Sequence, residues 1–172
     1  MASYRWLILA AGTLAATSLS AVQIGISAIA PELQGHYGLS LAQTAVVLAA
    51  TNAGMTMTLL AWGYISDRIG ERLSIGIGLT GAALALFGAA SAGAFALLVV
   101  ALVATGAFGA AVNSASGRAV MHWFAPEERG LALGIRQAAI PIGGFAGAIA
   151  LPAIVSARGV HAAFIARRDD RG

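Results

Sequence analysis

The sequence predicts an all-α membrane protein, a polytopic helical bundle with about five transmembrane helices. Of its 172 residues, 59% are hydrophobic and 10% are charged, whereas about a quarter of the residues are charged in an average soluble domain. Each expected span needs about 20 mainly apolar residues to cross a bilayer core roughly 30 Å thick. Uncharged segments of at least this length run over residues 6–31, 33–66, 73–117 and 137–157.

The first span is expected near residues 6–30. A cleaved secretory signal peptide is the alternative for this segment, because it has a positive start, an apolar run and small residues near Ala21. The apolar run continues to Ile29, which is longer than the apolar region of a typical signal peptide. We therefore expect this segment to remain in the protein as a membrane span.

Four further spans are expected along the rest of the chain. Two of them share the longest uncharged segment, and the small residues Ser-Ala-Gly-Ala at 91–94 mark the hairpin between them. In the last span, Pro141 is expected to kink the helix and Pro152 to mark its end, because proline lacks the N–H group that a helix interior uses. The expected bounds of these spans are 41–62, 73–91, 94–117 and 131–155.

The arginines predict the orientation in the membrane. All ten basic residues are arginine, and the formal net charge is +3. Because cytoplasmic loops retain positive charge, we expect a multi-pass protein of the plasma or inner membrane with a cytoplasmic amino terminus. The lipid bilayer is the expected partner, and this charge pattern gives no reason to expect nucleic acid. Only Arg158 falls near the other end of the spans, whereas the cytoplasmic side would carry Arg5, Arg68, Arg72, Arg118 and Arg129.

A charged segment, Gly-Tyr-Ile-Ser-Asp-Arg-Ile-Gly-Glu-Arg at 63–72, lies between the second and third expected spans. Gly63 allows a helix end to pack closely or bend, and Gly70 allows a turn that is closed to residues with a side chain. Asp67 supplies a carboxylate that an arginine or a helix amino terminus can hold. The segment resembles the pattern Gly-x-Leu-x-Asp-Arg-x-Gly-Arg-Arg, which joins the second and third spans in the major facilitator superfamily. It departs from that pattern at Ile65 and Glu71.

A second segment supports the same resemblance. His-Trp-Phe-Ala-Pro-Glu-Glu-Arg-Gly at 122–130 follows the fourth expected span and is similar to the family link Trp-Phe-x-Pro-x-x-Arg-Gly before the fifth span. Pro126 suits the first turn of a helix, and Glu127 and Glu128 suit its positive end. The resemblance covers nearly all of residues 1–164, which are expected to form an amino-terminal helical domain.

The resemblance implies a transporter that moves a small solute by alternating access, as two six-helix halves rock about a central site. It also implies a gating role on the cytoplasmic side for Gly63, Asp67, Arg68, Gly70 and Arg72. Residues 159–164 are similar to the entry of a sixth span, but the following charged tail, 165–172, does not fit in hydrocarbon. We therefore expect a chain truncated before or within the sixth span, whose missing partner is the carboxy-terminal half. A non-transporting five-helix protein with a structural or helix-binding role is the alternative.

Five polar residues in or near the expected spans are candidates for the solute cavity. The resemblance places polar groups of the first and fourth helices in that cavity. Arg136 is expected about 7–8 Å inside the fifth helix at 1.5 Å per residue. It either extends to the surface or, with Gln137, binds an organic anion. The amides either bond to neighbouring helices or contact the solute, and the full set is Gln23, Asn52, Asn113, Arg136 and Gln137.

The glycines are expected to serve helix packing. Gly-Ile-Gly-Leu-Thr-Gly at 76–81 matches a dinucleotide-binding pattern, but it lies inside an uncharged segment rather than between a strand and a helix. The histidines are scattered, cysteine is absent, and no nucleophile, base and orienting acid occur together. We therefore expect no enzyme activity, cofactor or metal site. The residues expected at close helix contacts or a kink are Gly106, Gly109, Pro141, Gly143, Gly144 and Gly147.

Overall fold

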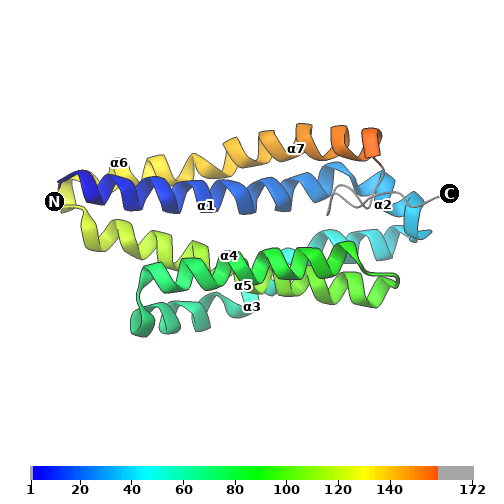
Figure 1. Cartoon of the computed structure of the whole chain (residues 1–172), viewed down its shortest axis with the longest axis horizontal. Helices are drawn as coiled ribbons and strands as arrows, with labels where there is room; N and C mark the ends of the chain where they lie inside the picture. The colour runs from blue at the N-terminus through cyan, green and yellow to red at the C-terminus, as the bar shows by residue number, and fades with distance from the viewer. Residues whose placement is uncertain (1, 159–172) are drawn as a thin grey trace.

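The protein is a bundle of long helices that lie side by side along its longest axis (Figure 1). The computed structural model describes residues 2–158, which contain no strand; the predicted tail and entry to a sixth span lie outside these residues. The helices are α1 (Ala2–Ala28), α2 (Ala30–Tyr37), α3 (Leu41–Ile69), α4 (Glu71–Ala90), α5 (Phe95–Trp123), α6 (Pro126–Gln137) and α7 (Ala139–Arg158).

Five helical stretches of the described chain are long and apolar enough to cross a membrane, so the predicted fold class is confirmed. The predicted hairpin at 91–94 lies between α4 and α5. The fifth stretch consists of α6 and α7 in succession. These stretches are Tyr4–Ala28, Leu41–Ile69, Glu71–Ala90, Phe95–Trp123 and Pro126–Ala157.

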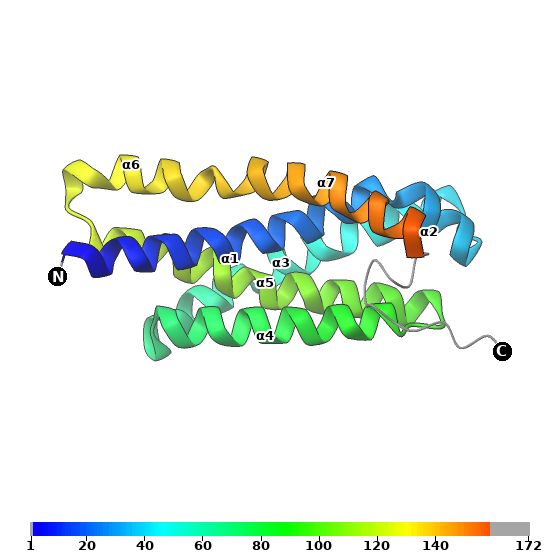
Figure 2. The same ribbon diagram turned by 45° about the horizontal axis from the view of Figure 1, so that its top comes forward.

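The helices pack in two groups that meet along α1 and α5. The main contacts join α1 to α7 in one group, and α3 and α4 to α5 in the other. Figure 2 shows α4 beside α5. In the same view α1 lies between these two helices and the successive helices α6 and α7. Because α1 also contacts α5 and α6, polar groups of these three helices lie within reach of one another.

Two helix ends extend further than the apolar segments of the sequence. The second span was predicted to end at residue 62 and the fifth to begin at 131, but α3 continues to Ile69 and α6 begins at Pro126. The backbone hydrogen bonds of a helix are made within the helix itself, so charged residues can extend it beyond the hydrocarbon. The segment at 63–72 is therefore mostly helix rather than loop.

Gly70 is the joint between α3 and α4. Its φ of 83° and ψ of 163° belong to a backbone region that is essentially restricted to glycine. Gly63, by contrast, lies inside α3, where an added Cβ would be 3.7 Å from the Ser114 hydroxyl oxygen. That is an ordinary contact, so Gly63 makes no close backbone contact with a neighbouring helix, and the bend expected there stays a prediction.

The two prolines of the fifth span differ in their effects. The helix is interrupted at Ala138, three residues before Pro141, where the missing N–H group and the ring disfavour a continuous helix. Pro152 was expected to mark the helix end, but it lies inside α7, which continues to Arg158. Neighbouring groups can compensate for a proline within a membrane helix.

Glycines bring the backbones of paired helices into contact. A Cβ added to Gly106 of α5 would be 1.8 Å from the carbonyl oxygen of Thr51 in α3, and one added to Gly147 of α7 would be 2.0 Å from that of Ala21 in α1. Gly143 and Gly144 are also closely covered by α1, whereas an added Cβ at Gly109 would make only an ordinary contact of 3.6 Å. Small residues at such contacts allow membrane helices to associate by close packing.

We predict that Gly106→Ala lowers the free energy of unfolding by about 1–3 kcal/mol, because the new methyl group must push α3 and α5 apart. Gly117→Ala is the matched control, since Gly117 lies on the same helix with no atom near the added Cβ. The measurement is thermal unfolding in detergent micelles followed by circular dichroism. Equal unfolding temperatures for the two variants would contradict the role of Gly106.

We also predict that Gly70→Ala destabilises the junction of α3 and α4 by about 1–3 kcal/mol, because alanine is strained at this φ and ψ. Gly76→Ala, in the exposed part of α4 where an added Cβ meets nothing, should instead stabilise the protein by about 0.5–1 kcal/mol. The same unfolding measurement compares both variants with the unmodified chain. A Gly70→Ala variant as stable as Gly76→Ala would disprove the proposed strain.

Candidate functional site

The candidate polar residues lie on four helices and form two hydrogen-bonded groups. In the first group, the Gln23 side-chain amide of α1 donates to the Asn52 amide oxygen of α3. Asn113 of α5 belongs to the second group, and its amide nitrogen is 3.5 Å from the Met55 sulfur of α3. Met55 and Gln23 line one small cavity between α1, α3 and α5. Met55 therefore contacts Asn113 of the second group and lines a cavity with Gln23 of the first.

Arg136 is the centre of the second group. Its Nε donates to the Ser116 hydroxyl oxygen at 2.8 Å, and its Nη2 donates to the backbone and side-chain oxygens of Asn113 at 2.9 and 3.2 Å. Its Nη1 donates to the Gln137 side-chain oxygen at 2.9 Å. The structure thus brings together Asn113, Arg136 and Gln137, three of the five predicted cavity residues.

Arg136 lies further from the start of its helix than the sequence predicted. It is ten residues after the start of α6 at Pro126, or about 15 Å along the helix at 1.5 Å per residue. Its partner Asn113 is ten residues before the end of α5, which is the same distance from that end of the bundle. The side chain therefore extends across to α5 at its own depth, rather than along the helix toward the surface.

The charge of Arg136 has only neutral partners. Asn113, Ser116 and Gln137 supply all of its hydrogen-bond acceptors, and no acidic side chain of residues 4–157 forms an ion pair with it. A positive charge is costly inside a membrane unless it reaches water or a counter-charge. The arrangement keeps the guanidinium in place and leaves its charge available to an anion.

A small cavity lies beside this group, with room for about one water molecule. Arg136 and Ser116 form one wall, and Gly12 and Thr13 of α1 form another. A Cβ added to Gly12 would be 3.1 Å from the Ser116 Cβ, so this glycine allows α1 to approach the group closely. The Thr13 hydroxyl oxygen is buried and has no hydrogen-bond partner among the described residues.

Sequence reasoning missed Ser116 and Met55. Ser116 lies three residues after Asn113, a spacing that puts both on one face of a helix, and this signal was available. No such signal was available for Met55, because the sequence does not show when an apolar side chain in an apolar span lies beside a polar group. Thr17, another hydroxyl residue of α1, bonds to the carbonyl oxygen of Thr13 within its own helix.

The predicted gating residues lie at one end of the bundle, which we call the arginine-rich end. Asp67 forms an ion pair with Arg118, which lies five residues before the end of α5. The guanidinium carbon of Arg68 lies 4.6 Å from the centroid of the Tyr64 ring. That of Arg72 lies 5.0 Å from the centroid of the Tyr4 ring. The sequence indicated that an arginine or a helix amino terminus could hold Asp67, but it did not indicate which group does. This end of the bundle carries Arg5, Arg68, Arg72, Arg118 and Arg129.

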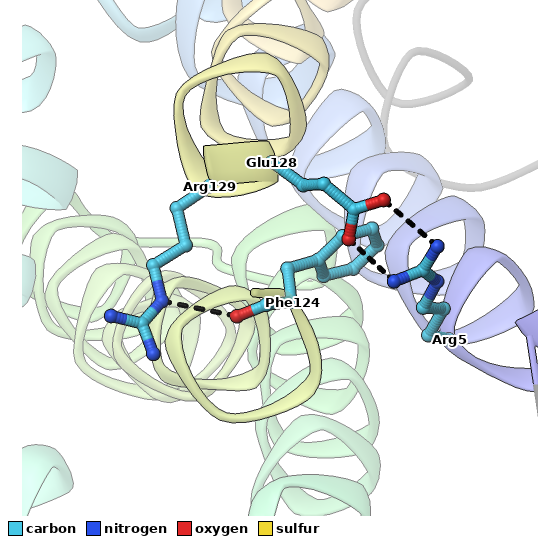
Figure 3. Close-up of polar contacts among 4 residues, drawn as sticks. All are labelled: Arg5, Phe124, Glu128 and Arg129. Atoms are coloured by element: carbon cyan, nitrogen blue, oxygen red, sulfur yellow. Dashed lines mark hydrogen bonds and ion pairs between the residues drawn. The ribbon is translucent and has the colours of Figure 1, made fainter. Parts of the chain in front are cut away.

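A second ion pair at this end joins α1 to α6, as Figure 3 shows. The guanidinium of Arg5 donates two hydrogen bonds to the carboxylate of Glu128, at 2.5 and 2.9 Å, and its carbon lies 5.3 Å from the centroid of the Phe124 ring. Arg129 donates to the backbone oxygen of Phe124 at 3.1 Å and to that of Met121 at 2.9 Å. Adjacent residues of α6 therefore hold the start of α1 and the end of α5.

The sequence and the fold are similar to those of membrane transporters. An uncharacterized MFS-type transporter of Mycobacterium tuberculosis is 37% identical over 159 residues, which are 92% of this chain and 35% of that protein. A hexuronate transporter of Escherichia coli K12 is 31% identical over 159 residues, which are 91% of this chain and 36% of that protein. A galacturonate transporter of Dickeya chrysanthemi is also 31% identical and is covered over 45% of its length.

A solved structure has the same fold. The inward-facing, unoccupied bacterial homolog of the human lysosomal transporter Spinster matches with a TM-score of 0.76 at 20% identity, over 96% of this chain and 37% of that one. The chain thus spans between a third and a half of the length of these relatives. The family model described as Major Facilitator Superfamily matches residues 8–166. Since this match includes most of the chain, the protein belongs to the major facilitator superfamily.

Proposed function

We propose that the chain is part of a secondary transporter that moves a small organic anion across the plasma or inner membrane by alternating access. Family membership and five apolar spans support transport. In this proposal, a carboxy-terminal half supplies the second set of helices, and the two halves rock against each other. The relatives are consistent with this, because the matched part is 35% of the M. tuberculosis protein.

The observation that carries the choice of an anion is the set of neutral partners around Arg136. A planar guanidinium fixed by hydrogen bonds on one side is well suited to binding a carboxylate on the other. Two relatives, the hexuronate transporter and the galacturonate transporter, support the same choice, since hexuronate and galacturonate are both carboxylates. A sugar acid is therefore the first class of solute to examine.

The contacts of the arginine-rich end support a gating role for Asp67 and its neighbours. Asp67 joins the end of α3 to α5 through Arg118, while Arg68 and Arg72 have no ion-pair partner among the described residues. We infer that these two guanidinium groups, which form no ion pair within residues 4–157, meet the opposite half when the cytoplasmic side closes. Gly70 contributes by setting the angle at which α4 leaves α3.

We propose that the arginine-rich end faces the cytoplasm. Positive residues are retained on that side of bacterial inner membranes, and the hairpin between α4 and α5 at the opposite end carries no charge. This orientation also places the amino terminus in the cytoplasm.

We predict that the chain in lipid nanodiscs binds galacturonate but not galactose, and that Arg136→Gln weakens this binding about 10- to 100-fold. The size follows from the loss of a charge-assisted hydrogen bond. The measurement is equilibrium binding of radiolabelled galacturonate. Arg129→Gln is the matched control, since Arg129 lies at the end of the bundle, and circular dichroism verifies that both variants fold. Equal affinity of Arg136→Gln and the unmodified chain would exclude an anion site at Arg136.

Labelling of single introduced cysteines tests the predicted orientation of the spans. The natural sequence has no cysteine, so each introduced thiol is the only reactive one. A membrane-impermeant maleimide should label Gly93→Cys in the hairpin on intact cells, and Ala125→Cys, between α5 and α6, only after lysis. The reverse pattern would place the amino terminus outside.

A further inference from the structure

Thr13 of α1 differs from other threonines of the spans in its hydrogen bonding. Thr17, Thr56 and Thr105 each donate to the carbonyl oxygen four residues earlier in their own helix, at 2.9 Å, as hydroxyl side chains in membrane helices commonly do. The Thr13 hydroxyl oxygen is buried and forms no hydrogen bond with any described residue. Because a buried hydroxyl group is costly to leave unpaired, Thr13 indicates a polar partner other than these protein groups.

The cavity that Thr13 lines admits only a small partner. It has room for about one water molecule, so a carboxylate group is too large for it. Its apolar wall includes the buried side chains of Leu9, Val120 and Phe124. A cation is disfavoured, because the guanidinium of Arg136 also lines the cavity. A single neutral water molecule matches both the size and the charge of this space.

The cavity also has enough polar groups to bind a water molecule. Ser116 donates its hydroxyl proton to the Val112 carbonyl oxygen at 2.6 Å and accepts a hydrogen bond from Arg136 Nε at 2.8 Å. Since a hydroxyl oxygen can accept two hydrogen bonds, one acceptor position of Ser116 is still available. Thr13 offers an unused donor. With Arg136 as the third polar group of the wall, the site meets the two to four polar partners that a buried water needs.

A water molecule at this position would link α1 to the group that holds Arg136. The contact of Gly12 with Ser116, where an added Cβ would be 3.1 Å from the serine Cβ, fixes the separation of α1 and α5 but not the rotation of the hydroxyl group. A water that donates to the second acceptor position of Ser116 fixes this rotation, because the proton and both acceptor positions then have partners. The orientation of the Arg136 Nε–H group follows from that of its acceptor.

We propose that one water molecule is bound in this cavity, accepts a hydrogen bond from the Thr13 hydroxyl and donates one to the Ser116 hydroxyl oxygen. Thr13 is then a positioning residue for Arg136, which it orients through the water and Ser116. The role of Thr13 in solute binding rests on the proposed anion site at Arg136, whereas the water site itself does not.

The water is tested by NMR of the full chain in lipid nanodiscs with 15N-labelled arginine. The Nε–H signal of Arg136 is identified by its loss in Arg136→Gln, and we expect a nuclear Overhauser effect between this proton and water. Thr13→Val, which replaces the hydroxyl by a methyl group of similar size, should remove the effect and shift the signal. Thr13→Ser restores a hydroxyl group and should restore both. Thr17→Val is the matched control, since the Thr17 hydroxyl bonds within its own helix.

The positioning role is tested by equilibrium binding of radiolabelled galacturonate to the same samples. Thr13→Val should weaken binding about 2- to 10-fold, because it removes neutral hydrogen bonds that orient the guanidinium. Thr13→Ser and Thr17→Val should bind as the unmodified chain does. Thermal unfolding followed by circular dichroism verifies that all three variants fold.

The outcomes separate the water site, the positioning role and the anion site. If the unmodified chain shows no Overhauser effect to water, or if Thr13→Val keeps it, the water site is wrong. A signal that shifts when chloride in the buffer is replaced by sulfate would identify a halide as the occupant and also overturn it. Loss of the effect in Thr13→Val with unchanged affinity would overturn the positioning role. If galacturonate does not bind the unmodified chain, the proposed anion site fails, and the NMR result still decides the water site.

Discussion

Direct contact between helix backbones is the constraint on which the rest of this structure depends. Inside a bilayer the lipid is as apolar as the side chains, so helices associate by close packing rather than by escape from water. Gly106 and Gly147 supply this packing at the contacts of α3 with α5 and of α1 with α7. These contacts fix the rotation of each helix, and the rotation in turn places Asn113 and Ser116 beside Arg136.

Much of the fold could be predicted from the positions of charged residues. Gaps between charges gave the number and order of the spans, because charge is the property that a bilayer excludes most strongly. The helix ends could not be predicted as well, since a helix satisfies its own backbone regardless of its side chains. Arg136 illustrates the consequence, because its distance from the helix start was predicted from residue 131, whereas α6 begins at Pro126.

The sequence pointed to individual polar residues of the candidate site, but it did not show which of them lie together. The sequence marks Gln23 and Asn52 as polar groups in apolar spans, yet it does not say which faces of their helices meet. That information lies in packing among residues of similar size and polarity, which leaves little pattern in a single sequence. Arg118 shows the same limit, because five arginines at one end were equally available to Asp67.

The interruption at Ala138 has a consequence for the backbone beside the site. The helix hydrogen bonds continue through it, since the Ala138 N–H donates to the Gly134 carbonyl at 3.0 Å and the Ile142 N–H donates to the Ala138 carbonyl at 3.2 Å. Pro141 has no N–H group, so the carbonyl oxygen of Gln137, four residues before it, lacks its usual helical donor. Pro141 thereby leaves a fixed partial negative charge on a backbone atom one residue from Arg136, and such a charge neither leaves nor titrates.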